Sequence, residues 1–383
     1  MDDQELRTDA VAAPLSELEL ACGLVFGSEP SATPLPAAGE LGSPLVELAR
    51  PLRRALERPP CLVAFSGGFD SSLVLSVARN VAVRQKLELP IPVTVRFARH
   101  LETQESIWQE SVVFELGLSD WERLEVGEEL ELLGPWARRA LHGAGPLWPP
   151  NAFMLLPLLD RASGGTLVTG IDGDAALGGS PWRRSAVLLP RAARRAVARR
   201  GVPHLGWLTA DGRSEMVKAW VRDEGQQPVA RDPWLRWYAR SRHLAVMRDS
   251  FERVASLANA RISHPLVDQR VLGAIAKRAG RRGFVTRQGA IDALFEGALP
   301  RALAARRGKA TFSAPLWGHA TRDVAAAMDL SGVPDGFVDR AALRAEWAKL
   351  RPDLRSAVLM QHVWLETQTP SGAAEPVIGS VRG

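Results

Sequence analysis

The sequence has few cysteines, few lysines and none of the common metal-binding motifs. Its 383 residues include two cysteines, Cys22 and Cys61, and neither belongs to a CxxC pair or a Cys/His cluster. This argues against a zinc site, a disulfide framework and thiol-transfer chemistry by paired cysteines. The motif GxxxxGK[ST] is absent as well, which excludes a Walker-type nucleotide site.

Long apolar runs are also missing. No stretch approaches the ~20 apolar residues that a membrane-spanning helix needs. The acidic beginning, MDDQELRTDA, lacks the apolar centre of a secretory signal. We therefore expect a cytoplasmic protein that does not associate with membranes.

The positive charge comes almost entirely from arginine. The net charge is +5, and five of the 48 basic residues are lysines: Lys86, Lys218, Lys277, Lys309 and Lys349. Such a modest excess suits an anionic ligand, but it is also common among ordinary proteins. Hydrophobic residues make up 46% and charged residues 24%, which are the proportions of a globular chain with a packed core.

Short apolar runs alternate with helical patterns along the first half of the chain. The run at residues 61–65 is typical of a buried parallel strand, and further strands are predicted at residues 91–97, 121–126 and 166–169. Apolar residues at helical spacing predict helices that include residues 44–58, 73–84, 106–116 and 151–162. This order predicts an α/β fold with a doubly wound parallel sheet, followed after Gly179 by a largely helical C-terminal region.

The beginning of the chain differs in composition from the remainder. Residues 27–43 carry Pro, Gly, Ser and Ala, which is typical of a linker. We therefore expect residues 1–43 to be an N-terminal extension and residues 44–375 to form one domain. No internal repeat and no long low-complexity tract divides the sequence further.

The most specific signal is the loop Ser66-Gly67-Gly68-Phe69-Asp70-Ser71-Ser72, directly after the first predicted strand. Two glycines let the backbone turn tightly and approach an anion closely. A helix that begins near Ser71 points free N–H groups and its positive dipole end at that anion. Asp70 is a poor phosphate contact but a good Mg²⁺ ligand beside one. The alternative is an ordinary strand-to-helix turn that contains glycines and binds no ligand.

This loop resembles the pyrophosphatase loop of the N-type ATP pyrophosphatases (PP-loop proteins), which include asparagine synthetase, GMP synthetase, NAD synthetase and tRNA-thiolating enzymes. The resemblance implies an enzyme that uses ATP and Mg²⁺, breaks the bond between the α- and β-phosphates and leaves an adenylated intermediate. It also implies that ATP and pyrophosphate are bound by Ser66, Gly67, Gly68, Asp70, Ser71, Ser72 and, in the next strand, Val95.

A second segment narrows the resemblance. TGIDGDAALGG, residues 169–179, follows a predicted strand, and strand ends of this kind bind ligands in open α/β sheets. It is similar to the form SGxGxDExFGG of asparagine synthetases. The resemblance implies that Asp174 is the second Mg²⁺ ligand beside Asp70, and that the backbone of Thr169 and Gly170 lies near the adenosine. The alternative is a surface loop rich in Gly and Asp.

A third series of motifs lies between residues 264 and 315. HPLVDQR, LP and RRGKATF follow one another here as PFLDxR, LLP and RxKxxF do in asparagine synthetases. The resemblance, which covers residues 45–370, implies that Lys309 contacts pyrophosphate and the reacting centre. Lys309 and Asp174 are therefore the predicted catalytic residues. Arg287 lies near a basic residue of those enzymes and is predicted to contact phosphate.

Several features depart from asparagine synthetases. No glutaminase domain with an N-terminal cysteine precedes the phosphate loop, so we expect no ammonia from that route. Ile171 stands where asparagine synthetase has Glu and β-lactam synthetase has Tyr, and Ile cannot act as a general base. Asp172 is adjacent but needs a different backbone register to replace it. Ala175 replaces the Glu after the metal-binding Asp, and together these changes argue against aspartate as the substrate.

The synthetase-only organisation and the C-terminal third are similar to asparagine-synthetase-like cyclases such as lasso-peptide macrolactam synthetases. We therefore expect an AMP-forming ligase that adenylates a carboxylate and joins it to an amine, with a peptide macrolactam as the leading product. One alternative is a ligase that amidates or condenses a small-molecule carboxylate, with ammonia or an amine from a partner protein. Another is a degenerate protein that holds ATP or a partner without turnover.

Residues 185–245 form an insert rich in Trp and Arg, for which two interpretations are open. The insert could bind an extended or acidic peptide, or it could be a helical packing layer with a solvated basic face. Its arginines alone are weak grounds for nucleic-acid binding, which we do not expect. The seven histidines show no metal-ligand spacing and are expected to be structural or superficial. Tyr238, the single tyrosine, has no assigned role.

Overall fold

The computed structural model describes residues 14–97, 106–178, 191–305 and 314–368. In this part of the chain, five parallel strands form one sheet in the order β3-β2-β1-β4-β5. They are β1 (Cys61–Ala64), β2 (Ile91–Phe97), β3 (Glu122–Val126), β4 (Thr166–Val168) and β5 (Arg261–Ser263). The predicted α/β fold with a doubly wound parallel sheet is confirmed.

The strand order reverses beside β1. β2 and β3 extend the sheet on one side of β1, whereas β4 and β5 extend it on the other. In register, Leu62 of β1 pairs with Ile91 of β2 and with Leu167 of β4. The chain segments that leave β1 and β4 therefore start side by side at the carboxyl edge of the sheet. Open α/β sheets bind their ligands at this position.

Helices connect the strands and make up most of the second half of the chain. Before residue 179 they are α1 (Glu17–Cys22), α2 (Pro44–Leu56), α3 (Phe69–Gln85), α4 (Ser106–Leu116), α5 (Pro135–Ala144), α6 (Leu156–Arg161) and α7 (Gly173–Leu177). After it they are α9 (Arg191–Arg200), α10 (Ala210–Gln226), α11 (Arg231–Tyr238), α12 (Arg242–Ser256), α13 (Gln269–Ala279), α14 (Arg287–Phe295), α15 (His319–Ala327), α16 (Arg340–Trp347) and α17 (Ala357–Gln368).

The central strands are apolar because both faces of the sheet are covered. Leu62, Val63, Leu167 and Val168 are all buried, as expected for parallel strands between helices. β5 was not predicted. It consists of Arg261, Ile262 and Ser263, and none of these side chains is fully buried. A polar edge strand of this length carries no apolar run, so its pairing with β4 depends on tertiary contacts.

Residues 14–43 pack onto the same body as the sheet. α1 begins with a capping box formed by Ser16 and Glu19, and Cys22 at its end is fully buried. The indole nitrogen of Trp207 donates to the carbonyl oxygen of Ala21 at 2.7 Å. Arg242 of α12 pairs with Glu19 at 2.9 Å. These contacts make the N-terminal segment part of the hydrophobic core.

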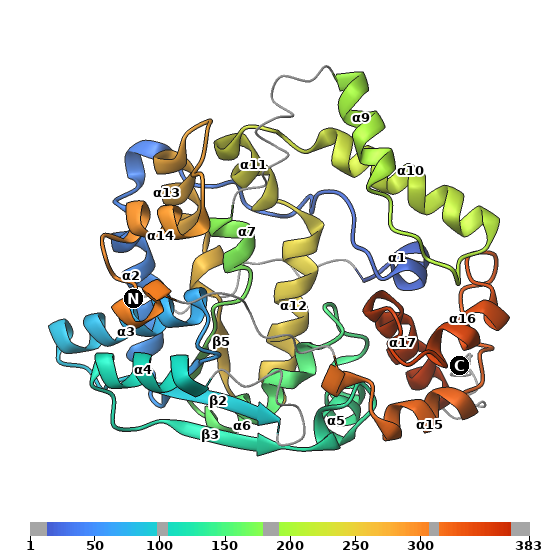
Figure 1. The fold of residues 1–383 in the computed structure, drawn as a ribbon, viewed down its shortest axis with the longest axis horizontal. Coiled ribbons are helices and arrows are strands. Elements are labelled where there is room, and N and C mark those ends of the chain that lie inside the picture. Colours follow the sequence, from blue (N-terminus) through green and yellow to red (C-terminus); the bar gives the residue numbers. More distant parts are fainter. Residues whose placement is uncertain (1–13, 98–105, 179–190, 306–313, 369–383) are drawn as a thin grey trace, which may run out of the picture.

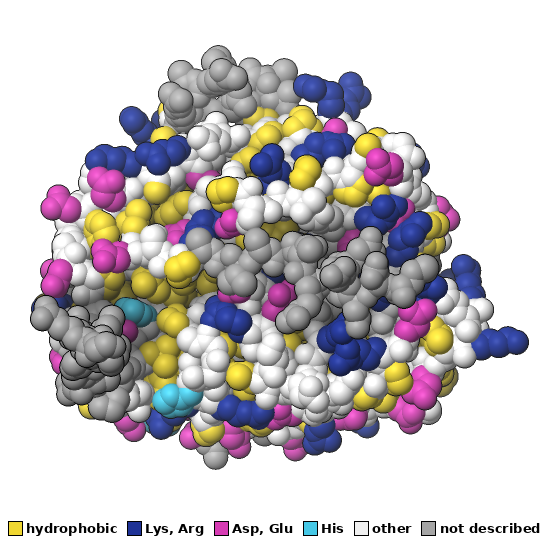
Figure 2. All heavy atoms as spheres, turned by 180° about the vertical axis from the view of Figure 1, so that it is seen from behind, with side chains coloured by type: hydrophobic (Ala, Val, Ile, Leu, Met, Phe, Trp, Pro, Cys, Tyr) yellow, Lys and Arg dark blue, Asp and Glu magenta, His cyan; other side chains and the backbone are white. Residues whose placement is uncertain are grey.

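Two groups of helices from the second half of the chain lie in different parts of the molecule. α9 and α10 lie at one end, away from the sheet, and α15, α16 and α17 lie together at one corner (Figure 1). On the opposite face, basic and acidic side chains are interspersed among apolar ones (Figure 2). Within the described ranges, no helix combines the length and the apolarity needed to cross a membrane.

Candidate active site

The phosphate loop leaves β1 and leads directly into α3. Gly67 has a φ of +79°, a conformation that a residue with a Cβ rarely adopts. Gly68 is the N-cap of α3, which begins at Phe69 and therefore earlier than the start expected near Ser71. The tight turn is complete at Gly68, so the helix can begin at once. Asp70 consequently lies in the first turn, where the helix dipole stabilises a carboxylate.

Serine side chains stabilise the conformation of the phosphate loop by hydrogen bonds within it. The backbone N–H of Ser66 donates to Oγ of Ser71 at 3.3 Å, and that of Gly68 donates to Oγ of Ser66 at 3.3 Å. Ser72 is fully buried, and its Oγ has no hydrogen-bond partner among the described residues. A contact between these serines and phosphate stays a prediction.

The segment that follows β4 lies directly against the phosphate loop. A Cβ added to Gly173 would lie 2.3 Å from Cγ of Asp70, and one added to Gly170 would lie 2.8 Å from the backbone nitrogen of Ser71. Real Cβ atoms do not approach other atoms so closely. Glycine at these two positions therefore lets the two segments touch and brings residues 169–174 beside Asp70.

Three charged side chains meet where the two segments touch. Arg287, the first residue of α14, forms ion pairs with both Asp70 and Asp174. We call these three residues the acidic cluster. The guanidinium offsets the repulsion between two neighbouring carboxylates. The side chain of Asp174 is 61% exposed, so this carboxylate is accessible to a ligand.

The acidic cluster suits Mg²⁺ bound together with a phosphate. Mg²⁺ commonly takes one or two carboxylates and fills its other positions with phosphate oxygens and water. In the described part of the chain, no group of three or more His, Cys, Asp or Glu residues is placed to hold a metal. Asp70 and Asp174 would hold such an ion together with the nucleotide, where it would supply positive charge to the phosphates.

The other predicted nucleotide residues lie on the neighbouring strands. Thr169 directly follows β4, and its Oγ1 lies 2.6 Å from Nδ1 of His264. Val95 lies half-buried in β2. Lys309 and the segment around it, residues 306–313, lie outside the described residues. The roles predicted for these residues are not tested by the geometry.

A second polar group surrounds Asp172, which lies in the same segment as Asp174. Its carboxylate accepts a hydrogen bond from the hydroxyl of Tyr238 and lies 3.5 Å from Nε2 of His243. We call these three residues the Asp172 cluster. Asp172 has a φ of +58°, which is uncommon outside glycine and is tolerated best by short polar residues. A backbone held in this conformation often marks a functional site.

The members of the Asp172 cluster shift one another's pKa values. Burial disfavours the charged form of Asp172, but the contacts with His243 and Tyr238 favour it more strongly, so the pKa of Asp172 falls below its ordinary value. Burial and the neighbouring Asp172 charge raise the pKa of Tyr238 well above its usual value. Asp172 is therefore an ionised acceptor, and Tyr238 is a neutral donor.

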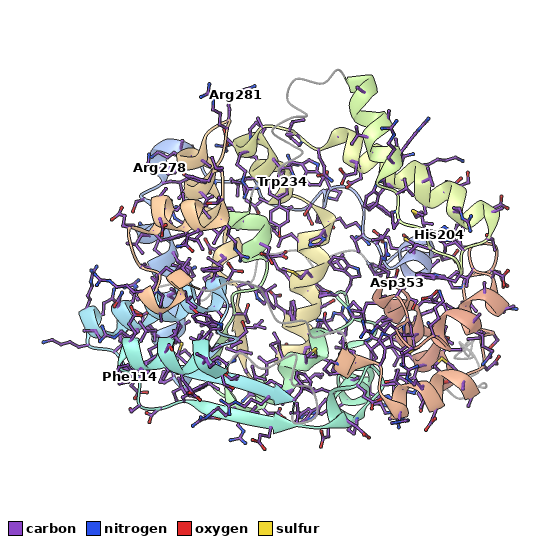
Figure 3. All side chains as sticks on the ribbon, in the orientation of Figure 1. Phe114, His204, Trp234, Arg278, Arg281 and Asp353 are labelled. Atoms are coloured by element: carbon purple, nitrogen blue, oxygen red, sulfur yellow. The ribbon has the colours of Figure 1, made fainter. Side chains whose placement is uncertain are left out.

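Tyr238 ties this cluster to α11. Its ring stacks on Trp234 with centroids 5.1 Å apart and an interplanar angle of 8°. Arg231 of the same helix lies over the Trp234 ring and donates to the carbonyl oxygen of Ala175 at 2.8 Å. Figure 3 shows Trp234, a residue of α11, whereas Arg278 and Arg281 lie at the outer edge of the molecule. One helix thus contacts the segment that carries both Asp172 and Asp174.

His243, in α12, is the exposed member of the Asp172 cluster. Its side chain is 42% exposed, and its ring meets that of Trp148 edge to face with centroids 4.6 Å apart. Trp148 is anchored in turn, because its indole nitrogen donates to the carbonyl oxygen of Gly23 at 3.3 Å. The accessible edge of the imidazole is therefore bounded by aromatic rings.

A family comparison agrees with the geometry of the two loops. The model of the asparagine synthase family matches residues 48–368, a range that contains the phosphate loop, the acidic cluster and the Asp172 cluster. The chain belongs to the asparagine synthase family. This membership supports an ATP-dependent amide-forming ligase as its general class, and the family generally uses ATP with Mg²⁺. No curated protein matches the chain.

Within this asparagine synthase family member, the tryptophan-rich insert has more than one structural role. Trp207 is 1% exposed and belongs to the core, and the Trp220 indole nitrogen donates to the carbonyl oxygen of Ala198, which joins α10 to α9. Tyr238 instead reaches the loop of the candidate site, and Trp234 stacks on the Tyr238 ring. The first pair fits a packing layer, whereas the second pair places α11 at the site.

Sequence reasoning did not find the Asp172 cluster. The sequence assigns no role to Tyr238, and it predicts a structural or superficial position for His243. Tyr238 and Asp172 are 66 residues apart, and no motif connects them. The one available signal was that Tyr238 is the single tyrosine of the chain. A hydrogen bond between two separate helical regions cannot be derived from such a signal.

Proposed function

We propose that this member of the asparagine synthase family is an AMP-forming ligase that adenylates a carboxylate and joins it to an amine, and that its product is a peptide macrolactam. One observation supports the proposal most directly. The short segment of residues 169–174 contributes Asp174 to the acidic cluster and Asp172 to the Asp172 cluster. The acidic cluster suits the phosphates of ATP. The Asp172 cluster adds polar groups next to them that ATP binding alone does not need.

The first step would occur beside the acidic cluster. A carboxylate oxygen of the substrate attacks the α-phosphorus of ATP, and the bond from that phosphorus to the pyrophosphate oxygen breaks. The first turn of α3 points its N–H groups toward the phosphates, and Arg287 adds a positive charge between Asp70 and Asp174. Groups that stabilise developing negative charge in this way are typically worth ~10²–10³ in rate each.

The second step would form the amide. The amine attacks the acyl carbon, a carbon–nitrogen bond forms, and the bond to the oxygen of AMP breaks. The amine must lose a proton in this step. Ile171 cannot take that proton, and its backbone N–H donates to Oγ1 of Thr169 at 3.3 Å. The proton acceptor must therefore be another residue.

The environment of the Asp172 cluster favours a peptide as the substrate. Trp148 packs against His243 and Trp234 packs against Tyr238, so two large aromatic rings adjoin this cluster. Rings of this kind bury apolar area and also offer polar edges, which suits peptide side chains. A site built only for ammonia or another very small amine does not need such surroundings.

Mass spectrometry with peptides tests the proposal. The protein is incubated with ATP, Mg²⁺ and a panel of peptides that have a free amino terminus and an internal Asp or Glu. We expect one peptide to lose one water while AMP and pyrophosphate appear in equal amounts. A parallel panel contains small carboxylates with ammonium. Turnover in that panel alone would replace the peptide by a small-molecule substrate, and ATP binding without any AMP would contradict ligase activity.

A further inference from the structure

We propose that Nδ1 of His243 accepts the proton that the attacking amine loses, and that Asp172 and Tyr238 are positioning residues that hold the imidazole for this step. The inference rests on the proposed function, because it concerns the second half of that reaction. It assigns a proton acceptor to a site in which Ile171 offers none.

His243 lies close to the segment that contributes to the candidate nucleotide site. Asp172 and Asp174 lie in one segment, and Arg287 links Asp174 to Asp70 in the first turn of α3. His243 lies 3.5 Å from Asp172, so it is one side chain removed from that segment. An acyl group attached to the α-phosphate would be held at the same end of the sheet.

The orientation of the imidazole also supports the inference. Nε2 faces the carboxylate of Asp172, which favours the tautomer with its hydrogen on Nε2. The other nitrogen, Nδ1, has no protein hydrogen-bond partner in the ranges that the structure describes. Because the side chain is 42% exposed, a substrate amine can reach it. A carboxylate that orients a histidine in this way also stabilises the imidazolium that forms on proton transfer.

The neighbouring titratable groups are less suited to the task. The hydroxyl of Tyr238 already donates to Asp172, and the side chain is buried. Asp172 is itself mostly buried and accepts from Tyr238. His264 lies nearby, but burial lowers its pKa to about 3 and its Nδ1 is occupied by Thr169. His243 is therefore the base of this group that is both accessible and unoccupied.

The step balances without a further reactant. The nitrogen lone pair of the amine forms the bond to the acyl carbon, and the electron pair of the carbon–oxygen bond leaves with AMP. The N–H proton moves to Nδ1 of His243, and the imidazolium later releases it to solvent. Trp148 and Tyr238, with ring centroids 4.6 and 6.2 Å from that of His243, flank the imidazole and leave its exposed part open to the substrate.

Separate assays of the two half-reactions test the inference. Adenylation is followed by ATP–pyrophosphate exchange, and amide formation by product mass, with the carboxylate that supports exchange in the wild-type protein. We expect His243→Ala to keep exchange within about twofold while amide formation falls ~10²–10³-fold, the usual contribution of a general base. Added imidazole should restore amide formation at least ~10-fold in His243→Ala, because it supplies the missing base.

His142→Ala is the matched control. His142 also meets a tryptophan ring edge to face, with centroids 5.0 Å apart, but its partner is Trp364 of α17. It should leave both half-reactions at the wild-type rate. Amide formation that is unchanged in His243→Ala, or that falls in parallel with exchange and is not restored by imidazole, would overturn the inference and leave the ligase proposal standing. Absence of exchange with every carboxylate in the wild-type protein would overturn the ligase proposal itself.

A measurement on the wild-type protein covers the case in which His243→Ala does not fold. Diethyl pyrocarbonate modifies unprotonated, accessible imidazole nitrogens, and peptide mass spectrometry locates the modified residues. We expect His243 to react readily and His264, whose Nε2 is buried and whose Nδ1 contacts Thr169, to stay unmodified. If His142 reacts while His243 does not, the free nitrogen that the inference requires is absent and the inference fails.

Discussion

The acidic cluster and the Asp172 cluster share one segment of chain but are built differently. The acidic cluster joins the starts of two helices, since Asp70 lies in the first turn of α3 and Arg287 is the first residue of α14. The Asp172 cluster joins the end of α11 to the start of α12 through Tyr238 and His243. The acidic cluster presents the exposed carboxylate of Asp174. In the Asp172 cluster the carboxylate is mostly buried, and the more exposed group is the imidazole of His243.

This difference matches the two kinds of chemistry that the reaction needs. Phosphate and Mg²⁺ are the same for every substrate of such an enzyme, so backbone loops and carboxylates can bind them in a constant way. The amine differs between substrates, so the groups around it depend on side chains from separate helices. We therefore expect variants of the acidic cluster to stop both half-reactions and variants of the Asp172 cluster to affect only the second.

The largest effect is expected from Asp70→Asn. Loss of the carboxylate removes a predicted Mg²⁺ ligand and leaves Arg287 paired with Asp174 alone. Both ATP–pyrophosphate exchange and amide formation should fall about 10³-fold. Asp292→Asn is the control, because Asp292 is an exposed residue of α14 whose one hydrogen-bond partner among the described residues is Gln288. Exchange at the wild-type rate in Asp70→Asn would show that this carboxylate does not serve the phosphates.

The second largest effect is expected from Gly173→Ala. The new Cβ would lie 2.3 Å from Cγ of Asp70, so the Asp70 carboxylate must leave its position. A misplacement of about 1 Å at a reacting centre typically costs ~10²-fold in rate, and we expect a loss of this size in exchange. Gly206→Ala is the control, because nothing lies within 4 Å of its added Cβ. Equal exchange rates in the two variants would contradict the importance of the loop contact.

The parts of the site that sequence reasoning predicted are those that depend on local backbone geometry. The phosphate loop needs glycine for a positive φ at Gly67 and needs Asp70 at a helix start, so its residues appear together in the sequence. The strands β1, β2 and β4 were recognisable by their apolar residues, and β3 was predicted although three of its five residues are charged. β5 was missed because its three residues are polar or half-exposed and pair with β4 only in the folded protein.

The parts that were missed depend on contacts between distant segments. Tyr238 meets Asp172 because α11 is held against α7, in part by the hydrogen bond from Arg231 to Ala175. No spacing rule connects such residues. Arg287 was predicted as a phosphate contact, and the structure brings it into the acidic cluster, but its ion pairs with both carboxylates could not be derived from its position in the sequence.

A smaller effect is expected from Tyr238→Phe, which probes the Asp172 cluster without removing its base. Asp172 would lose one donor, and the imidazole of His243 would be held less firmly. Amide formation should fall about 10-fold, which corresponds to the ~1–3 kcal/mol of a buried unsatisfied acceptor. ATP–pyrophosphate exchange should change by less than about twofold, and an equal fall in both assays would assign Tyr238 a purely structural role.

The smallest effect concerns stability rather than rate, and it tests the protonation state of His264, which contacts Thr169. Burial lowers the pKa of His264 to about 3 from its ordinary value of 6.5, so the folded protein keeps this imidazole neutral. The unfolded chain takes up a proton below pH 6.5, and the free energy of unfolding therefore decreases as the pH falls. The slope is about 1.4 kcal/mol per pH unit for one proton.

The pH window can be chosen so that His264 dominates. The pKa values of Glu19, Glu47 and Asp172 are lowered from 4.5, 4.5 and 3.8, so their stabilising effect is lost only at more acidic pH. Between pH 6.5 and 5, denaturant unfolding should show a loss of about 2 kcal/mol. His264→Asn should flatten this slope, because Asn cannot take up a proton. The same slope in both proteins would mean that another group titrates, and that burial does not keep the imidazole of His264 neutral.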